Sequence, residues 1–263
     1  MRTRRGLLDR PARAVLSVLL LASCAGDAST VADPVRAAVA ANFAGAQSEL
    51  AALFEQRTGH RVETSSGSSG QLYAQIRNGA PFHLFLSADE ERPLALEREG
   101  RTVPGSRFSY ARGRLVLYGP SLDRVRAGGA DLLTSSVVHV AIANPETAPY
   151  GAAAMDALEA LELLEAVTPS LVRAESVAQA RQFVGSGAAE MGFLALAQVR
   201  GEPRGRYWLL PDTLHRPIVQ DAVLLGPGAE HEGARAYLEF LRGPEAARVL
   251  VAHGYEPAAG VGG

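Results

Sequence analysis

Serine and glycine fill six consecutive positions, Ser65 to Gly70, between a strand-like run and a helical one. The pattern predicts that a strand ends here and that a helix begins at Ser69. The first N–H groups of a helix have no acceptor within that helix and carry a partial positive charge. Together with serine hydroxyls they can bind an anion although no side chain is formally charged. We therefore expect an oxyanion-binding site at this turn.

Three further segments share the order of strand, small or polar turn and helix. They are Ala41-Asn42-Phe43, the run from Asn144 to Gly151 that contains Tyr150, and Glu175-Ser176-Val177. Asn42 suits an N-cap and adds an amide donor, whereas Tyr150 and Val177 would each offer a main-chain N–H. Ligands of open α/β sheets lie beyond the carboxyl ends of the strands, so we expect all four turns to meet in a cleft between two lobes. For each turn taken alone, helix capping is the alternative explanation.

Residue types suited to other chemistries occur, but not in the patterns that those chemistries need. The histidines are scattered and no two have the spacing of a helical zinc motif, so we interpret each as a surface or loop residue and predict no transition-metal site. A hydrolase would need Ser66, Ser68 or Ser69 beside a base such as His139 or His215, and no G-x-S-x-G motif is present. The net charge of −2 gives no basic field for nucleic acid. We expect a binding protein rather than an enzyme.

The first residues predict an export signal rather than a part of the fold. A basic start is followed by an apolar run over 14–22, which is too short to span a bilayer. Leu21-Ala22-Ser23-Cys24 resembles the lipobox of bacterial lipoproteins, and Cys24 is the only cysteine. We predict a signal peptide over 1–24, lipidation at Cys24, a tether over 25–34 and a location on the periplasmic or cell-surface side of the membrane. An ordinary secretory peptide is the alternative, and the export route, Sec or twin-arginine, stays open.

Apolar strand-like runs alternate with helical stretches along the rest of the chain, which predicts an α/β fold. Strands are expected at 35–40, 61–65, 82–86, 108–111, 114–118, 137–143, 171–174, 191–195 and 218–225. Helices are expected at 44–57, 69–78, 89–99, 152–166, 177–184, 232–241 and 244–253. We predict one lobe from 35–110 with 222–263 and a second lobe from 111–221, with the chain crossing near Tyr110 and Asp221.

Several segments of the chain resemble the periplasmic molybdate-binding proteins that serve ABC transporters. They are AAVAANF, TGHRVETSSGSSGQLYAQIRNGAPFHLFLSAD, PGSRFSYARGRLVLY, IANPETAPYGAAA and SGAAEMGF, and the resemblance extends from Val35 to Pro257. It implies the two-lobed, hinged type II binding-protein fold, with mixed sheets and flanking helices. It also implies that a monomer without a cofactor binds molybdate or tungstate and donates it to a membrane permease.

The resemblance also implies which residues hold the ligand. The positions that match the family's ligand contacts are Ala41, Asn42, Ser69, Tyr150 and Val177. These residues would bind the oxygen atoms of molybdate, and its metal would be held only through those oxygens. Relatives commonly carry a hydroxyl residue at the position of Ala41, and alanine cannot supply that oxygen. Tyr150 and Val177 would act through their main-chain N–H groups.

Other ligands of the same fold stay open at this point. Sulfate, phosphate and organic anions use similar donors, although hydrogen phosphate needs an acceptor and the matched positions offer no carboxylate. A ferric-ion site would need clustered tyrosine or histidine ligands, and no such set is evident. A sensory or adhesive lipoprotein that uses the fold without transport is a further alternative.

Overall fold

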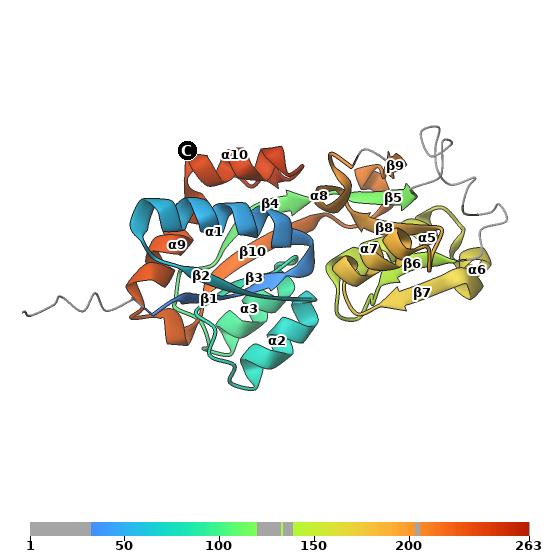
Figure 1. Ribbon diagram of the computed structural model, residues 1–263. Helices are drawn as coiled ribbons and strands as arrows, with labels where there is room; N and C mark the ends of the chain where they lie inside the picture. The colour runs from blue at the N-terminus through green and yellow to red at the C-terminus, as the bar shows by residue number, and fades with distance from the viewer. Residues whose placement is uncertain (1–32, 120–132, 134–138, 203–205, 263) are drawn as a thin grey trace, which may run out of the picture. The chain divides into compact units, whose positions relative to one another are not determined.

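The computed structural model describes residues 33–119, 133, 139–202 and 206–262 (Figure 1). Residues 32–263 belong to one compact unit, which holds every helix and strand described here. Cys24, the predicted signal peptide and the tether up to residue 32 lie outside the described residues. Among the helices that are described, none has the length and apolar character needed to cross a membrane.

The first lobe is built on a six-stranded mixed sheet in the order β11-β4-β10-β3-β1-β2. Its strands are β1 (Val35–Ala40), β2 (Val62–Gly67), β3 (Leu84–Leu86), β4 (Phe108–Gly113), β10 (Ile218–Leu224) and β11 (Glu256–Pro257). Its helices are α1 (Ala44–Thr58), α2 (Ser69–Arg77), α3 (Glu91–Arg98), α9 (Glu232–Arg242) and α10 (Pro244–Ala252). Strand β1 runs parallel to β2 and β3, while β10 runs antiparallel to β3 and β4.

Alternation along β1 explains why helices cover both faces of this sheet. Val35, Ala37 and Val39 point to one face and join the core formed with α1, α9 and α10. Ala38 points to the other face, where it packs with Leu72 of α2 and residues of α3. A strand that is buried on both faces reads as a continuous apolar run, as β1 does from Ala37 to Ala40.

The second lobe has a five-stranded sheet in the order β7-β6-β8-β5-β9 and a single core. Its strands are β5 (Leu115–Gly119), β6 (Val140–Ala143), β7 (Leu171–Ala174), β8 (Met191–Ala195) and β9 (Arg206–Leu209). Its helices are α5 (Pro149–Ala160), α6 (Leu164–Val167), α7 (Val177–Ser186) and α8 (Leu196–Val199). The predicted class, two α/β lobes with mixed sheets, is confirmed.

The chain passes between the sheets where β4 gives way to β5 and where β10 begins (Figure 1). The first passage lies between Gly113 and Leu115, and the chain has returned at Ile218. The sequence predicted a second lobe over 111–221, so both points lie a few residues inside that range. The first lobe extends further than predicted, because β4 and β10 pair with each other as far as Gly113 and Ile218. Motion of the lobes about these strands stays a prediction.

Two predicted elements differ from the structure in an informative way. The helix expected over 152–166 begins earlier, with Pro149 in its first turn, and is broken into α5 and α6 where Glu162 takes a positive φ of 59°. The strand expected over 61–65 continues to Gly67, because Ser65, Ser66 and Gly67 pair in register with β1. The turn is therefore shorter than predicted, and it begins at Ser68.

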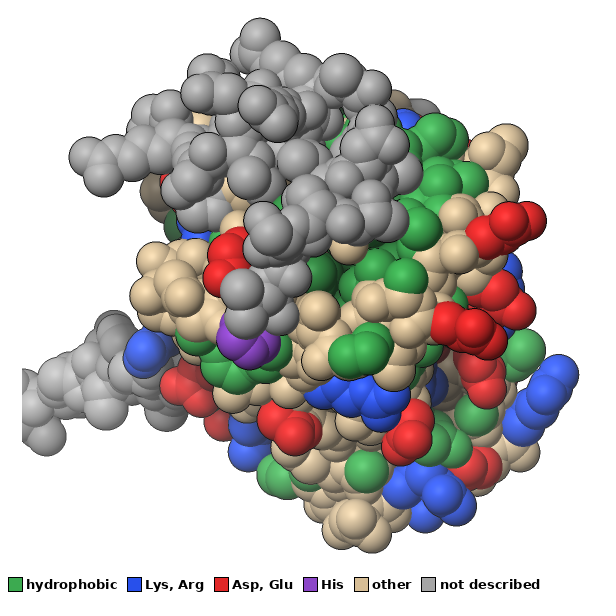
Figure 2. All heavy atoms as spheres, turned by 90° about the vertical axis from the view of Figure 1, so that its right-hand side faces the viewer, with side chains coloured by type: hydrophobic (Ala, Val, Ile, Leu, Met, Phe, Trp, Pro, Cys, Tyr) green, Lys and Arg blue, Asp and Glu red, His purple; other side chains and the backbone are tan. Residues whose placement is uncertain are grey.

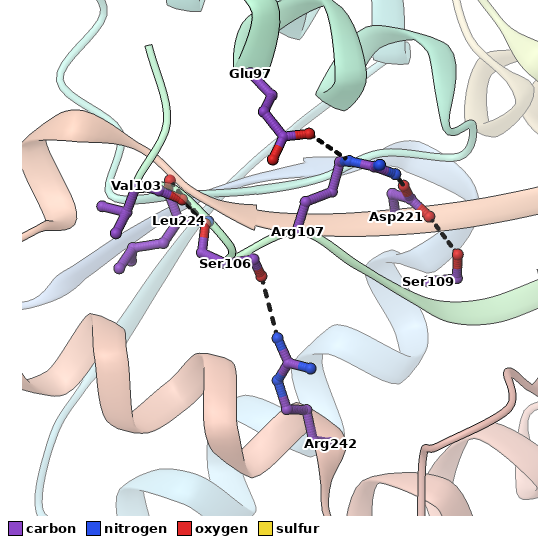
Figure 3. Close-up of polar contacts among 8 residues, drawn as sticks. All are labelled: Glu97, Val103, Ser106, Arg107, Ser109, Asp221, Leu224 and Arg242. Carbon is purple, nitrogen blue, oxygen red and sulfur yellow. Dashed lines mark hydrogen bonds and ion pairs between the residues drawn. The ribbon is translucent and has the colours of Figure 1, made fainter. Parts of the chain in front are cut away.

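The fourth residue of β10, Asp221, is a buried carboxylate (Figure 3). Asp221 is fully buried, and its oxygens accept hydrogen bonds from Arg107 at 2.6 Å and from Ser109 at 2.7 Å. Arg107 also donates to Glu97 at 3.0 Å. The hydrogen bonds to Asp221 and then to Glu97 raise the pKa of Arg107, so the guanidinium stays charged. The pair fixes β4 to β10 close to the passage between the lobes.

Candidate functional site

One small cavity is lined by all five residues that were predicted to hold a ligand. Its wall consists of Ala40, Ala41, Asn42, Ser68, Ser69, Ala88, Ala148, Pro149, Tyr150 and Val177. The cavity has a volume of only about 10 Å³. No lining side chain carries a formal charge. The cavity therefore suits a compact guest that is recognised by neutral hydrogen-bond donors.

Four chain segments reach this cavity at the starts of helices. Asn42 follows β1 in the short 3-10 helix Ala41–Phe43, and Ser69 opens α2 after β2. In the second lobe Tyr150 lies in the first turn of α5 and Val177 opens α7. Main-chain N–H groups at such positions have no acceptor in their own helix. The strands before these turns are parallel within each sheet, so the turns lie at one edge, as predicted.

The hydroxyl of Ser69 is oriented by the main chain. Its Oγ accepts a hydrogen bond from the N–H of Ala88 at 2.9 Å, and the residue is buried. Because that oxygen already accepts, its own hydrogen is free to be donated to a guest. Ser69 thus presents an O–H donor and a helix-terminal N–H on the same wall of the cavity.

Asn42 has a different role from the one expected of its side chain. Its amide nitrogen donates to Gln220 Oε1 at 3.0 Å and to the hydroxyl of Tyr255 at 3.1 Å. The Tyr255 hydroxyl in turn donates to the carbonyl of Asn42 at 2.7 Å. Both amide hydrogens are therefore committed to the protein. The expectation of an amide donor for the ligand is corrected, and only the main-chain N–H of Asn42 is available.

The phenol of Tyr150 reaches away from the donors, toward the strands that connect the lobes. A Cβ placed on Gly113 of β4 would clash with this hydroxyl and would lie 2.7 Å from Gln220 Nε2. Burial raises the pKa of Tyr150 well above that of a free phenol, so the group is neutral. This placement agrees with a contribution through the main-chain N–H rather than through the hydroxyl.

The serine-rich segment divides into two parts. Ser65 and Ser66 are exposed residues of β2 and do not line the cavity, so the expectation that the whole segment gathers hydroxyls at one site is wrong for them. Ser68 and Ser69 are buried and line it. Ser68 was not among the predicted ligand residues. Its place directly before the first helical residue was the available signal, but capping explained it equally well.

Contacts between the lobes close the structure around this cavity. The N–H of Gly70 donates to the carbonyl of Thr147 at 2.8 Å. Gln71 donates to Glu175 at 2.9 Å, and Arg92 donates to the carbonyl of Glu146 at 3.0 Å. Each contact joins a first-lobe residue to one of the second lobe. The structure therefore has the two lobes in contact on either side of the cavity.

A larger hollow of about 750 Å³ shares Ala88 and Pro149 with the cavity wall. Its wall carries more acidic than basic side chains: Asp89, Glu90, Glu91, Glu146 and Asp156 against Arg92, Arg107 and Arg216. These arginines are already paired with carboxylates of the protein. The face shown in Figure 2 likewise intersperses acidic and basic side chains. An anion would thus find its donors in the small cavity and not in this hollow.

A catalytic arrangement does not form around the buried serines. The lining of the cavity that holds Ser68 and Ser69 includes neither His139 nor His215. The ring of His215 instead contacts the carbonyl of Arg216 at 2.8 Å. A serine nucleophile without a neighbouring base stays a weak nucleophile.

Asp33, His83 and His231 form a cluster whose ligand atoms lie within 4.8 Å of one another. Both ring nitrogens of His83 face donors of Arg36, at 3.2 and 2.9 Å. Nδ1 of His231 accepts from the N–H of Ala234, so its Nε2 carries the proton and contacts the Asp33 carbonyl at 3.1 Å. No ring nitrogen keeps a free lone pair for a cation, and the Arg36 charge would oppose one. The donor set ties the start of β1 to α9 and does not fit a metal.

His83 is buried but lies in the bend before β3, so it is a loop residue, as the interpretation of each histidine as a surface or loop residue allows. Burial, followed by the nearby His231 and Arg36, lowers the pKa of His83 to about 4. The unfolded chain takes up this proton as the pH falls through about 6.5, whereas the folded protein resists it down to about 4. Stability should therefore fall between these two values.

We expect His83→Gln to remove part of the acid sensitivity of the fold. The wild type should lose about 1–2 kcal/mol more between pH 7 and pH 5 than the variant, because glutamine does not titrate. Urea unfolding at the two pH values measures this difference. His139→Gln, at an exposed histidine, is the matched control and should retain the wild-type slope. Equal slopes for the wild type and His83→Gln would show that His83 does not contribute.

The sequence and the structure of this chain are similar to those of known proteins. Residues 35–256 match the family model described as bacterial extracellular solute-binding protein. The chain is 48% identical to the molybdate-binding protein ModA of Azotobacter vinelandii over 238 residues, which cover 89% of this chain and 93% of that protein. It is 47% identical to the ModA of Rhodobacter capsulatus, with 93% and 94% covered. The solved structure of the Azotobacter vinelandii periplasmic molybdate-binding protein superposes with a TM-score of 0.81 at 42% identity, covering 84% of this chain and 98% of that one.

Proposed function

Because the chain belongs to the bacterial extracellular solute-binding proteins, we propose that it captures molybdate in the cavity between its lobes and serves an ABC transporter. The observation that carries the proposal is the convergence of uncharged donors from four helix starts on one small cavity. Tungstate, which has the same tetrahedral shape and charge, is included as a second ligand. A thermal-shift experiment tests the function, because a ligand of the folded state raises its stability by mass action.

The donors on the cavity wall are sufficient to hold a small dianion. They are the N–H groups of Asn42, Ser69, Tyr150 and Val177, together with the Ser69 hydroxyl. Each hydrogen bond to a charged acceptor contributes about 1.5–3 kcal/mol net. Several of them can offset the dehydration of the anion and leave about −8 kcal/mol, which corresponds to micromolar binding. Neutral donors also avoid the burial of unpaired cations in the empty protein.

Competing oxyanions differ in what they require from the site. Hydrogen phosphate carries a proton that needs an acceptor, and the cavity lining includes no carboxylate. Sulfate needs the same donors as molybdate but is smaller, so it would leave some of them at a longer distance. Sulfate is therefore the alternative ligand, and a titration separates the two.

Removal of the Ser69 hydroxyl should weaken molybdate binding by about 10- to 100-fold. Ser69→Ala deletes one hydrogen bond to a charged acceptor, a loss of about 1.5–3 kcal/mol. Tyr150→Phe should change the affinity little, since its hydroxyl lies beside Gly113 and Gln220. Isothermal titration calorimetry of both variants measures the effect. A large loss for Tyr150→Phe, with Ser69→Ala unchanged, would reverse the assignment of donors.

Delivery requires that the ligand be enclosed and then released to a membrane permease. Contacts such as Gly70 to Thr147 join the lobes around the cavity, and the two connecting strands are suited to a hinge. We propose that the protein acts as a monomer which closes on its ligand and opens against the permease.

We also propose that the protein is exported and held at the outer side of a membrane by lipid on Cys24. The sequence before Cys24 supports this proposal through its basic start, short apolar run and lipobox-like end. Cys24→Ser should move the protein from the membrane fraction to the soluble fraction of the producing cell. An unchanged distribution would argue for an ordinary secretory peptide. Ligand binding should be the same in both proteins.

A further inference from the structure

Ser68 carries a buried hydroxyl in the wall of the small cavity. The residue is 3% exposed, lines the small cavity, and its Oγ has no hydrogen-bond partner among the described residues. A buried hydroxyl without a partner costs free energy, because it has lost its contacts with water. Its place in the cavity wall means that a guest could supply the missing partner.

Helix capping does not account for this hydroxyl. Ser68 is the N-cap of α2, and with Gln71 at the third helical position it has the residue arrangement of a capping box, but no hydrogen bond from a helix N–H reaches its hydroxyl. Its own N–H is held by Gln71 Oε1 at 3.3 Å. By contrast, the hydroxyl of Ser176, the N-cap of α7, accepts from the N–H of Gln179 at 3.3 Å. The two serines occupy equivalent positions before their helices, but of their two hydroxyls only the Ser176 hydroxyl accepts a hydrogen bond from its helix.

The composition of the cavity wall gives Ser68 a function. Ala41 lies on the same wall and has no hydroxyl to donate, whereas Ser69 next to Ser68 has one. We propose that the Ser68 hydroxyl is a further ligand donor, which supplies the hydrogen bond that Ala41 cannot make. This inference rests on the proposed function, because it names an additional residue of the same oxyanion site. The oxyanion would accept from two adjacent hydroxyls at the start of α2.

The test compares two substitutions that treat the helix cap differently. Ser68→Ala removes the hydroxyl and leaves a poor N-cap, whereas Ser68→Gly removes it and leaves a tolerated N-cap. Both variants should bind molybdate about 10-fold more weakly in calorimetry, as expected for one lost hydrogen bond to a charged acceptor. Ala41→Ser combined with Ser68→Ala should recover most of that loss. Ser186→Ala, at an exposed serine outside the cavity wall, controls for a generic effect of the exchange.

The outcomes separate this inference from the proposed function. If the wild type binds molybdate and both Ser68 variants bind within twofold of it, the hydroxyl is not a ligand donor and the inference is overturned. A lower melting temperature of ligand-free Ser68→Ala with unchanged affinity would assign Ser68 to capping alone and would also overturn it. If the wild type binds neither molybdate nor tungstate, the proposed function fails and the inference fails with it.

Discussion

Replacement of Gly70 by alanine should weaken molybdate binding on the order of 100-fold. A Cβ at this position would lie 2.9 Å from the Cα of Thr147 and 3.0 Å from its carbonyl oxygen, both in the opposite lobe. The same approach places the N–H of Gly70 2.8 Å from that oxygen. Overpacking of this kind costs about 1–3 kcal/mol, and its upper end corresponds to about 100-fold in affinity.

The ligand-free protein should not share this loss. Alanine is favoured over glycine inside a helix, and Gly70 is the second residue of α2. The three atoms nearest to such a Cβ all belong to Thr147, so this clash is absent when the lobes are apart. Calorimetry of Gly70→Ala should therefore show weak molybdate binding. Thermal unfolding of the ligand-free variant should show an unchanged or slightly raised melting temperature.

Gly45→Ala is the matched control for this experiment. Gly45 also lies in a first-lobe helix, and a Cβ there would meet only His253 at an ordinary distance of 3.7 Å. Its affinity should equal that of the wild type. If Gly70→Ala bound molybdate as tightly as Gly45→Ala, the approach of the two lobes at Thr147 would not be needed for binding.

The largest expected effect on stability belongs to the ion pair of Arg107 with the buried Asp221, close to the passage between the lobes. Arg107→Ala should lower the free energy of unfolding by about 3–5 kcal/mol, because it leaves the fully buried Asp221 carboxylate without its cation. Among the residues that the structure describes, Ser109 would then be the one remaining donor to that carboxylate. Urea unfolding of the ligand-free protein measures the loss.

Two further variants show whether the uncompensated charge is the cause. Adding Asp221→Asn to Arg107→Ala should recover part of the loss, since the amide carries no charge. Arg101→Ala breaks an exposed pair with Glu99 and should cost no more than about 1 kcal/mol. A cost below about 1 kcal/mol for Arg107→Ala as well would mean that water or another group compensates Asp221.

The local sequence pattern was sufficient to predict the limits of several short apolar strands. Strands β1, β7 and β8 have the limits that the sequence predicts, because each is a short and mostly apolar run. The end of β2 was not predictable in this way. Serine and glycine favour a turn, but pairing with Ala38, Val39 and Ala40 holds Ser65 to Gly67 in the sheet.

The convergence of the proposed site residues on one cavity could be predicted, whereas the partners of their side chains could not. Helix starts after strands brought Asn42, Ser69, Tyr150 and Val177 to one cavity. The Asn42 amide is taken by Gln220 and Tyr255, which lie 178 and 213 residues further along the chain. No local signal reports such a contact. For the same reason the free hydroxyl of Ser68 became evident only in the structure.

Calorimetric titration of the protein beginning at residue 25 with molybdate, tungstate, sulfate and phosphate at pH 7 tests the central claim most directly. The neutral donors of the small cavity predict one site per chain, with micromolar or tighter binding of molybdate and tungstate, and much weaker binding of sulfate and phosphate. Equal affinity for sulfate would contradict the selectivity. Absence of binding by all four anions would contradict the claim that these helix starts form an oxyanion site.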